Sequence, residues 1–214
     1  MSAAPLLWPA WVFDMDGTLT VPTPDFEEIR EELGLPPGRA ILEQLDLLPE
    51  EEAAPLYAEL ARIEEAHAHE ATVAPGAREL LEHLEGRARL GILTRNTRAN
   101  AFLTLQAVGL AGFFEELDVL GRDEAPPKPD PAGVLELLGR WGHAPAQGVM
   151  VGDYRFDLEA GRAAGTAVVY CDQSATFEFA HLADHCVASL GELLPPAGRS
   201  PGPPRAPGDS APGL

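Results

Sequence analysis

Short apolar runs alternate with amphipathic segments along most of this chain. Short apolar runs are typical of buried strands, and apolar residues spaced three or four apart are typical of helices that cover a sheet. The pattern predicts strands at residues 11–13, 90–93, 117–120, 149–151, 167–170 and 186–188. It predicts helices at residues 77–84, 97–108, 131–141 and 155–164. Because strands that alternate with helices indicate βαβ units, we expect an α/β fold with an open, parallel, Rossmann-like sheet flanked by helices.

Residues 21–74 interrupt this alternation because they carry helical patterns and no strand pattern. Apolar residues recur at helical spacing in three groups: Phe26, Ile29 and Leu33; Ile41, Leu45 and Leu48; Leu56, Leu60 and Ile63. We therefore expect a small all-helical cap at 21–74, inserted after the first strand, and a core formed by residues 1–20 and 75–194. Residues 195–214 hold seven prolines and four glycines, a composition typical of a disordered tail.

Composition and charge narrow the possible partners. The 214-residue chain has a formal net charge of -19 at pH 7, which argues against nucleic acid or an anionic membrane as a partner. No apolar run reaches the length of a membrane span, and residues 1–10 carry no basic segment before an apolar one, so we expect neither a membrane anchor nor a signal peptide. Cys171 and Cys186 do not form a C-x-x-C pair, and we expect reduced thiols in a cytoplasmic protein. The oligomeric state is not indicated.

Polar residues stand at the ends of the predicted strands. The carboxyl ends of parallel strands meet at one edge of a sheet, where ligands bind in open α/β folds. The residues that we expect to meet there are Asp14 and Asp16 after the first strand, Thr94 after the second, Lys128 after the third, and Asp153 and Asp157 after the fourth. Lys128 is the only lysine in the sequence. Two acidic pairs, one hydroxyl and one lysine are therefore predicted to form one site.

This combination of residue types favours phosphoryl transfer. Several carboxylates that face one point repel each other unless a hard divalent cation lies between them, and oxygen-only ligands suit Mg²⁺. A lysine ammonium and a threonine hydroxyl suit the oxygens of a transferring phosphoryl group. One carboxylate is able to act as the nucleophile, and a second one is able to protonate the leaving oxygen and later activate water.

The motifs DMDGTLT, GILTRN, PPKPDP and VGDYRFD resemble, in order and spacing, the four signature motifs of the haloacid dehalogenase-like hydrolase superfamily. The resemblance spans about residues 10–192 and implies the phosphatase branch with a small helical cap. It implies that Asp14 is the nucleophile and Asp16 the general acid/base, and that Thr94 and Lys128 contact the phosphoryl group. It further implies a magnesium site formed by Asp14, the backbone carbonyl of Asp16 and Asp153, with Asp157 as a water-mediated ligand or a support.

Three functions remain open at this point. The first is a magnesium-dependent phosphatase that hydrolyses a small phosphomonoester through an aspartyl-phosphate. The second is a phosphomutase or phosphotransferase with the same first half-reaction, and the third is a phospho-accepting module without enzymatic turnover. By the resemblance, an aspartate at position 16 disfavours a dehalogenase, and a cap without lysine disfavours a phosphonate-cleaving enzyme.

The residues around Thr94 are candidates for substrate binding. Arg95 is placed to bind a substrate carboxylate or second phosphate, and a surface position is the alternative. Asn96 and Thr97 begin the next helix, where they serve as caps or help to hold phosphate. The predicted substrate-binding set is Thr94, Arg95, Asn96 and Lys128.

Other candidates have less support in the sequence. We expect rim or packing contacts more than substrate contacts for Tyr154 and Arg155, and a solvated cap surface for His67 and His69. Asp123 and Glu124 either pair with Lys128 or remain loop charges.

Overall fold

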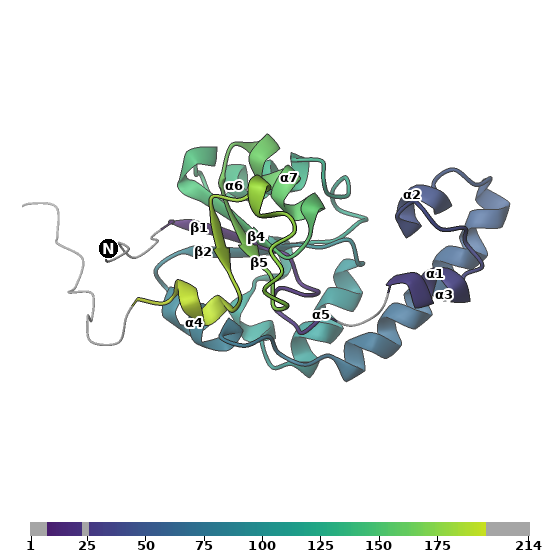
Figure 1. The fold of residues 1–214 in the computed structure, drawn as a ribbon, viewed down its shortest axis with the longest axis horizontal. Helices are drawn as coiled ribbons and strands as arrows, with labels where there is room; N and C mark the ends of the chain where they lie inside the picture. The colour runs from purple at the N-terminus through teal and green to yellow at the C-terminus, as the bar shows by residue number, and fades with distance from the viewer. Residues whose placement is uncertain (1–7, 23–25, 196–214) are drawn as a thin grey trace, which may run out of the picture.

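The computed structural model describes residues 8–22 and 26–195. Six strands form one sheet in the order β3-β2-β1-β4-β5-β6, and every neighbouring pair is parallel. The strands are β1 (Ala10–Phe13), β2 (Arg89–Leu93), β3 (Val119–Leu120), β4 (Gly148–Gly152), β5 (Ala167–Cys171) and β6 (His185–Val187). The order places β1 at the centre of the sheet, between β2 and β4 (Figure 1).

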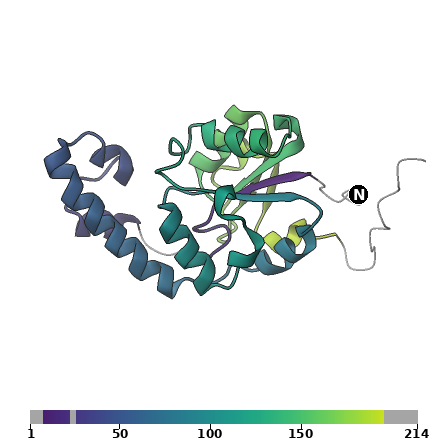
Figure 2. The same cartoon turned by 180° about the vertical axis from the view of Figure 1, so that it is seen from behind.

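Helices cover both faces of this sheet, which confirms the predicted fold class. The helices that follow the cap are α4 (Ala77–Leu84), α5 (Arg98–Ala107), α6 (Ala132–Arg140) and α7 (Arg155–Ala164). Figures 1 and 2 show α6 and α7 on one face, and α4 and α5 on the other. Among the described residues, no helix is long and apolar enough to cross a membrane.

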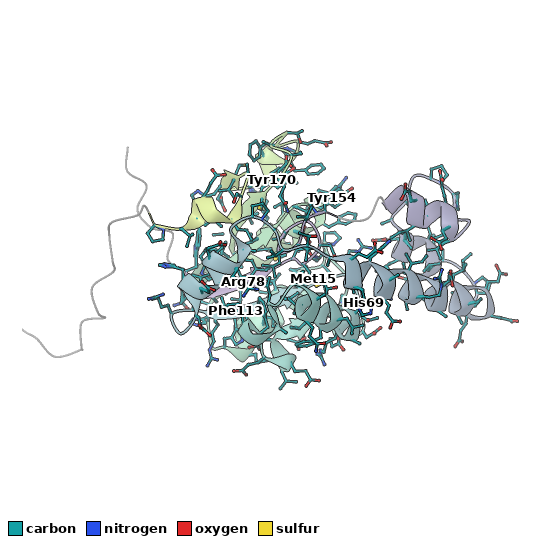
Figure 3. All side chains as sticks on the ribbon, turned by 90° about the horizontal axis from the view of Figure 1, so that it is seen from below. Met15, His69, Arg78, Phe113, Tyr154 and Tyr170 are labelled. Atoms are coloured by element: carbon teal, nitrogen blue, oxygen red, sulfur yellow. The ribbon has the colours of Figure 1, made fainter. Side chains whose placement is uncertain are left out.

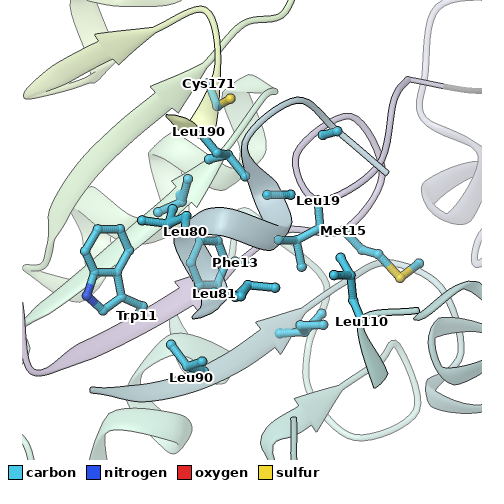
Figure 4. Close-up of a cluster of buried hydrophobic side chains, with 14 of the residues drawn as sticks. Trp11, Phe13, Met15, Leu19, Leu80, Leu81, Leu90, Leu110, Cys171 and Leu190 are labelled. Carbon is cyan, nitrogen blue, oxygen red and sulfur yellow. The ribbon is translucent and has the colours of Figure 1, made fainter. Parts of the chain in front are cut away.

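The central strand is buried on both sides, which is why its sequence is apolar without alternation. Trp11 and Phe13 pack into a cluster with α4 and α5, shown in Figure 4, whereas Val12 packs with α6 on the opposite face. All four residues of β1 are fully buried. The strand is therefore a rigid support for the polar residues that follow it.

Residues between β1 and α4 form three helices, α1 (Phe26–Glu32), α2 (Ile41–Leu45) and α3 (Glu50–Glu70), which we call the cap. They have their own apolar cluster, which includes Ile29, Leu45, Leu60 and Ile63. In Figures 1 and 2 the cap lies to one side of the sheet, and its helix α3 runs back to α5 of the core. The side chain of Phe26, predicted on the same apolar face, lies outside the described residues, as do residues 196–214 of the predicted tail.

The two connections between core and cap run side by side. Thr20 and Val73 form an antiparallel bridge, and the Val21 amide donates to the Thr72 carbonyl over 2.8 Å. The Ala74 amide donates to the Leu19 carbonyl over 2.9 Å. This short paired segment joins the cap to the loop that follows Asp16. The exact boundaries between core and cap, at residues 20/21 and 74/75, stay a prediction.

Most differences from the predicted bounds concern one or two residues, but two have a clear physical cause. The third strand begins at Val119 because Glu116–Asp118 form a 3₁₀ turn that leaves Leu117 63% exposed. The helix predicted from Pro131 begins at Ala132, so Pro131 and not the predicted Asp130 is its N-cap residue; Asp130, one position earlier, accepts from the Ala132 amide at Oδ1 over 2.9 Å. The helix predicted to include Leu48 ends at Leu45.

Candidate active site

Asp14 is positioned by the sheet itself. Its amide donates to the Val151 carbonyl over 2.8 Å, so the pairing of β1 with β4 continues one residue beyond β1. The chain then turns at Gly17, which has a φ of +83°. A Cβ at Gly17 would lie 2.1 Å from Asp153 Oδ2, so only glycine permits this approach of the first loop to the fourth. The Asp-Gly-Thr turn therefore sets both the direction of the chain and its distance from Asp153.

Lys128 lies between two of the predicted carboxylates. Its Nζ contacts Asp14 Oδ1 and lies 2.6 Å from Asp157 Oδ1. Lys128 and Asp157 are each 2% exposed. Burial opposes the charge on Lys128, but Asp14 and Asp157 outweigh this effect and raise the pKa of Lys128 above its ordinary value. The only lysine of the chain is therefore a buried ammonium at neutral pH.

Three carboxylates form a group that fits a divalent cation. Asp14, Asp153 and Asp157 each offer an oxygen, and these oxygens all lie within 4.8 Å of one another. Burial raises the pKa of Asp14 to about 6, Asp157 adds to the rise, and Lys128 opposes it. Burial and the other two carboxylates also raise the pKa of Asp153. One ammonium among three carboxylates leaves an excess of negative charge, and the donors are all oxygens, so the group suits Mg²⁺.

Asp16 lies outside this group of three and has a different partner. Its Oδ2 accepts a hydrogen bond from Asn96 Nδ2 over 2.8 Å. Burial raises the pKa of Asp16 to about 7, with Asp14 adding to the rise and Lys128 and the Asn96 amide opposing it. The predicted use of the Asp16 backbone carbonyl as a metal ligand stays a prediction. A carboxyl with a pKa near 7 is able to give and take a proton at neutral pH.

The loop after β2 carries Thr94 to the same edge. The Thr94 amide donates to the Leu120 carbonyl over 3.0 Å, and Thr94 Oγ1 accepts from the Asn96 amide over 3.2 Å. Thr97 caps α5, because its side chain accepts from the Asn100 amide. Of the two residues predicted as caps, Thr97 fills that role and Asn96 contacts Asp16 instead.

Arg95 is partly buried and has partners in both the core and the cap, and its predicted contact with substrate stays a prediction. Its Nη2 contacts both carboxylate oxygens of Glu43 at 2.6 Å, and its Nη1 donates to the Lys128 carbonyl over 3.2 Å. Its guanidinium also lies over the Phe156 ring, 4.9 Å from the centroid. Because Glu43 belongs to α2, Arg95 joins the loop after β2 to the cap.

The residues with weaker support are placed as follows. Tyr154 is 48% exposed and lies on the side of the core that faces the cap, as Figure 3 shows. Arg155 pairs with Glu159, His67 is half-buried and His69 is exposed on α3. Within the described part of the chain, Lys128 pairs with Asp14 and Asp157, and Glu124 pairs with Arg98 at 3.6 Å, so the alternative in which Asp123 or Glu124 pairs with Lys128 is wrong.

Sequence reasoning missed three charged residues near the site: Glu43, Glu64 and Arg122. Arg122 Nη1 contacts Glu64 Oε1 at 2.6 Å and donates to the Arg95 carbonyl over 3.2 Å. Glu64 lies on α3 and is one of fourteen glutamates and aspartates in the cap sequence at 21–74, and no motif distinguishes it. The signal that was available is its position on α3, directly after Ile63 and one turn before Ala68, both of which are buried.

A parallel α/β core, a helical cap inserted after the first strand, and an acidic group with a lysine at the carboxyl edge define a capped Rossmann-like enzyme. The chain belongs to the haloacid dehalogenase-like hydrolase family, whose sequence profile matches residues 20–171. It is therefore a hydrolase. The matched range includes Thr94, Lys128, Asp153 and Asp157 and begins after Asp14 and Asp16.

Individual relatives agree with this assignment. A haloacid dehalogenase-like hydrolase domain-containing protein, At2g33255 of Arabidopsis thaliana, is 29% identical over 184 residues, which is 78% of this chain and 71% of the relative. A phosphoglycolate phosphatase of Pseudomonas putida is 31% identical over 185 residues, which is 74% of this chain and 67% of the relative. The crystal structure of a hydrolase from Pseudomonas syringae is similar with a TM-score of 0.69 at 23% identity, covering 86% of this chain and 95% of that one, and supports the fold.

Proposed function

We propose that this hydrolase is a magnesium-dependent phosphatase that acts on a small phosphomonoester through a phosphorylated Asp14. The observation that carries the proposal is the contact of buried Lys128 with both Asp14 and Asp157, beside Asp153. An ammonium and an acidic group at one point suit a phosphoryl group, because the phosphoryl oxygens need positive charge and a carboxylate is the nucleophile. The similarity to a phosphoglycolate phosphatase supports phosphate-ester chemistry.

In the first half-reaction, a carboxylate oxygen of Asp14 attacks phosphorus and the bond from phosphorus to the alcohol oxygen breaks. Asp16 gives its proton to that departing oxygen, so the alcohol leaves uncharged. A pKa of about 7 keeps part of Asp16 protonated at neutral pH. Lys128 Nζ and Thr94 Oγ1 are the groups that hold the phosphoryl oxygens as their charge redistributes.

In the second half-reaction, Asp16 is ionised and accepts a proton from water. The water oxygen bonds to phosphorus, the bond to Asp14 breaks, and inorganic phosphate leaves as the Asp14 carboxylate is restored. Bound Mg²⁺, held by Asp14, Asp153 and the Asp16 carbonyl with Asp157 in support, would supply the positive charge that lets an anionic ester approach. Asp157 also keeps the geometry rigid, because its Oδ2 accepts from the Tyr154 amide over 3.0 Å.

The experiment that tests this function is phosphate release from a panel of phosphorylated metabolites, with and without Mg²⁺. We expect release from one or a few esters, loss of release after chelation, and recovery when Mg²⁺ is added back. Phosphate that remains on the product would identify a phosphomutase instead, and a phosphoprotein that persists for hours would identify a phospho-accepting module. Release that survives complete removal of divalent cations would contradict the metal requirement.

The pH dependence tests the role of Asp16. Transfer to Asp14 needs protonated Asp16, so its single-turnover rate is expected to fall as the pH rises through the pKa of Asp16. The Asn96 amide stabilises the ionised form and lowers that pKa. In Asn96→Ala, the alkaline limb of the pH–rate profile should therefore move to higher pH, at the same Mg²⁺ concentration.

Thr97→Ala is the matched control for Asn96→Ala. It removes the α5 cap, whose accepting contact is with the Asn100 amide, and it removes no contact with Asp16. It should lower stability by about 1 kcal/mol and leave the alkaline limb in place. A limb that is unchanged or moved to lower pH in Asn96→Ala would argue against Asp16 as the proton donor.

A further inference from the structure

Two core arginines lie next to the proposed phosphoryl site. Arg95 follows Thr94 and donates to the Lys128 carbonyl over 3.2 Å. Arg122 donates to the Arg95 carbonyl over 3.2 Å, and its own amide donates to the Asn96 carbonyl over 2.9 Å. Arginines in this position would ordinarily suit a second anionic group of a substrate, such as a carboxylate or another phosphate.

Both arginines are already paired with carboxylates of the cap. Glu43 from α2 accepts through both oxygens from Arg95, and Glu64 from α3 accepts from Arg122, all at 2.6 Å. The side chains of Arg122 and Glu64 are 9% and 11% exposed, whereas those of Arg95 and Glu43 are 21% and 39% exposed. The cap therefore neutralises the positive charge that the core offers beside the phosphoryl site.

Glu64 also has an unused acceptor. Its Oε2 is buried and has no hydrogen-bond partner among the described residues, while its Oε1 holds Arg122. Glu64 is connected to Asp16 through two residues: Arg122, which Glu64 binds, donates its amide to the Asn96 carbonyl, and Asn96 Nδ2 donates to Asp16 Oδ2. A buried carboxylate oxygen without a partner is unfavourable unless a donor reaches it. The leaving group of the substrate is the part that lies near Asp16, so it is the natural source of that donor.

We propose that Glu64, together with Glu43, selects phosphate esters whose leaving group carries a hydroxyl or ammonium donor and rejects esters with a second anionic group. The proposal rests on the phosphatase function proposed above. A carboxylated leaving group would meet the Glu64 carboxylate, or would have to displace Glu43 or Glu64 and leave that carboxylate without its arginine. A leaving group with a hydroxyl or ammonium instead donates to Glu64 Oε2. The substrate class is therefore polyol, sugar or amino-alcohol monophosphates.

Three esters with one two-carbon skeleton test the proposal: 2-hydroxyethyl phosphate, 2-aminoethyl phosphate and phosphoglycolate. They place a hydroxyl, an ammonium or a carboxylate at the same distance from the phosphate. We expect kcat/KM for phosphoglycolate to be at least about tenfold below that of either other ester. In Glu64→Gln the ratio of 2-aminoethyl phosphate to phosphoglycolate should fall at least about tenfold, because the negative charge is removed and the shape is kept.

Two further variants separate the contributions of the glutamates. Glu43→Gln should increase the relative use of phosphoglycolate as well, because Arg95 is more exposed and is released for a substrate carboxylate. Glu59→Gln is the matched control, since Glu59 lies on the same helix α3 but is exposed and pairs with the exposed Arg62. It should leave the ratio unchanged. A ratio that is the same in Glu64→Gln and wild type, or phosphoglycolate as the best of the three esters, would overturn the proposal.

Binding measurements distinguish failure of this proposal from failure of the phosphatase function. The three esters are titrated calorimetrically into the Mg²⁺-loaded protein with Asp14→Asn, which is expected not to turn over. The same order of affinity supports the selection by Glu64 even when the wild-type protein releases no phosphate from any ester, a result that would overturn only the phosphatase function. Tightest binding of phosphoglycolate would overturn the selection, whether or not phosphate is released.

Discussion

Asp14→Asn is expected to abolish turnover, lowering kcat by at least about 10⁴-fold. Asparagine keeps the size of the side chain but has no carboxylate oxygen to attack phosphorus, so the first half-reaction cannot start. Phosphate release under saturating Mg²⁺ and substrate measures the effect. When the reaction of an ester with a radioactive phosphorus label is quenched rapidly with acid, a labelled phosphoprotein should be trapped in the wild type and none in the variant. A variant that keeps more than about one hundredth of wild-type kcat would exclude Asp14 as the nucleophile.

The stability of Asp14→Asn tests whether such a loss comes from misfolding. Burial raises the folded-state pKa of Asp14 from 3.8 to about 6, so this group favours the folded state below pH about 4 and loses that contribution as the pH rises through about 6. At pH 8 without divalent cations, the neutral asparagine should therefore give a Tm at least as high as that of the wild type. Mg²⁺ should raise the Tm of the wild type more than that of the variant, because Asp14 is one of the proposed ligands.

The sequence was sufficient to predict that these polar residues meet at one edge of the sheet, because their meeting depends on topology. Asp14 and Asp153 each follow a buried apolar run, and a parallel sheet brings the carboxyl ends of its strands to one edge. The sequence predicted that Lys128 would lie at this edge, but it did not predict which residues Lys128 would contact, because the loop that carries Lys128 has no periodic pattern. Its contacts with Asp14 and Asp157 depend on how that loop closes over the edge.

The cap contacts were beyond prediction from the sequence for a physical reason. Glu43 and Glu64 come from two different helices, and their ion pairs with Arg95 and Arg122 depend on how the whole cap sits against the core. Helical periodicity defines the apolar face of each helix, but it does not say which charge on the remaining surface meets another element. The side-chain partner of Asn96 was missed likewise, because a helix start suggests capping and a contact with Asp16 spans 80 positions.

Lys128→Met is expected to abolish activity and to destabilise the protein by about 3–5 kcal/mol at neutral pH. Methionine has a similar length and no charge, so Asp14 and Asp157 remain buried without the ammonium that now contacts both. Because Lys128 lowers the pKa of Asp14, its removal raises that pKa further, and the variant binds protons that the unfolded chain has already released. The deficit in the free energy of unfolding, measured in urea, should therefore be larger at pH 8 than at pH 5.5.

Mg²⁺ separates the two roles of this lysine. A divalent cation among Asp14, Asp153 and Asp157 offsets the negative charge that the lysine leaves behind, so Mg²⁺ should recover part of the stability of Lys128→Met at pH 8. It should not recover kcat, which we expect to stay at least about 10³-fold low because no ammonium holds the phosphoryl oxygens. Arg62→Met removes an exposed cation of α3 and should change neither the stability at pH 8 nor kcat. Wild-type stability in Lys128→Met at pH 8 without Mg²⁺ would show that the contacts of Lys128 do not hold the acidic group together.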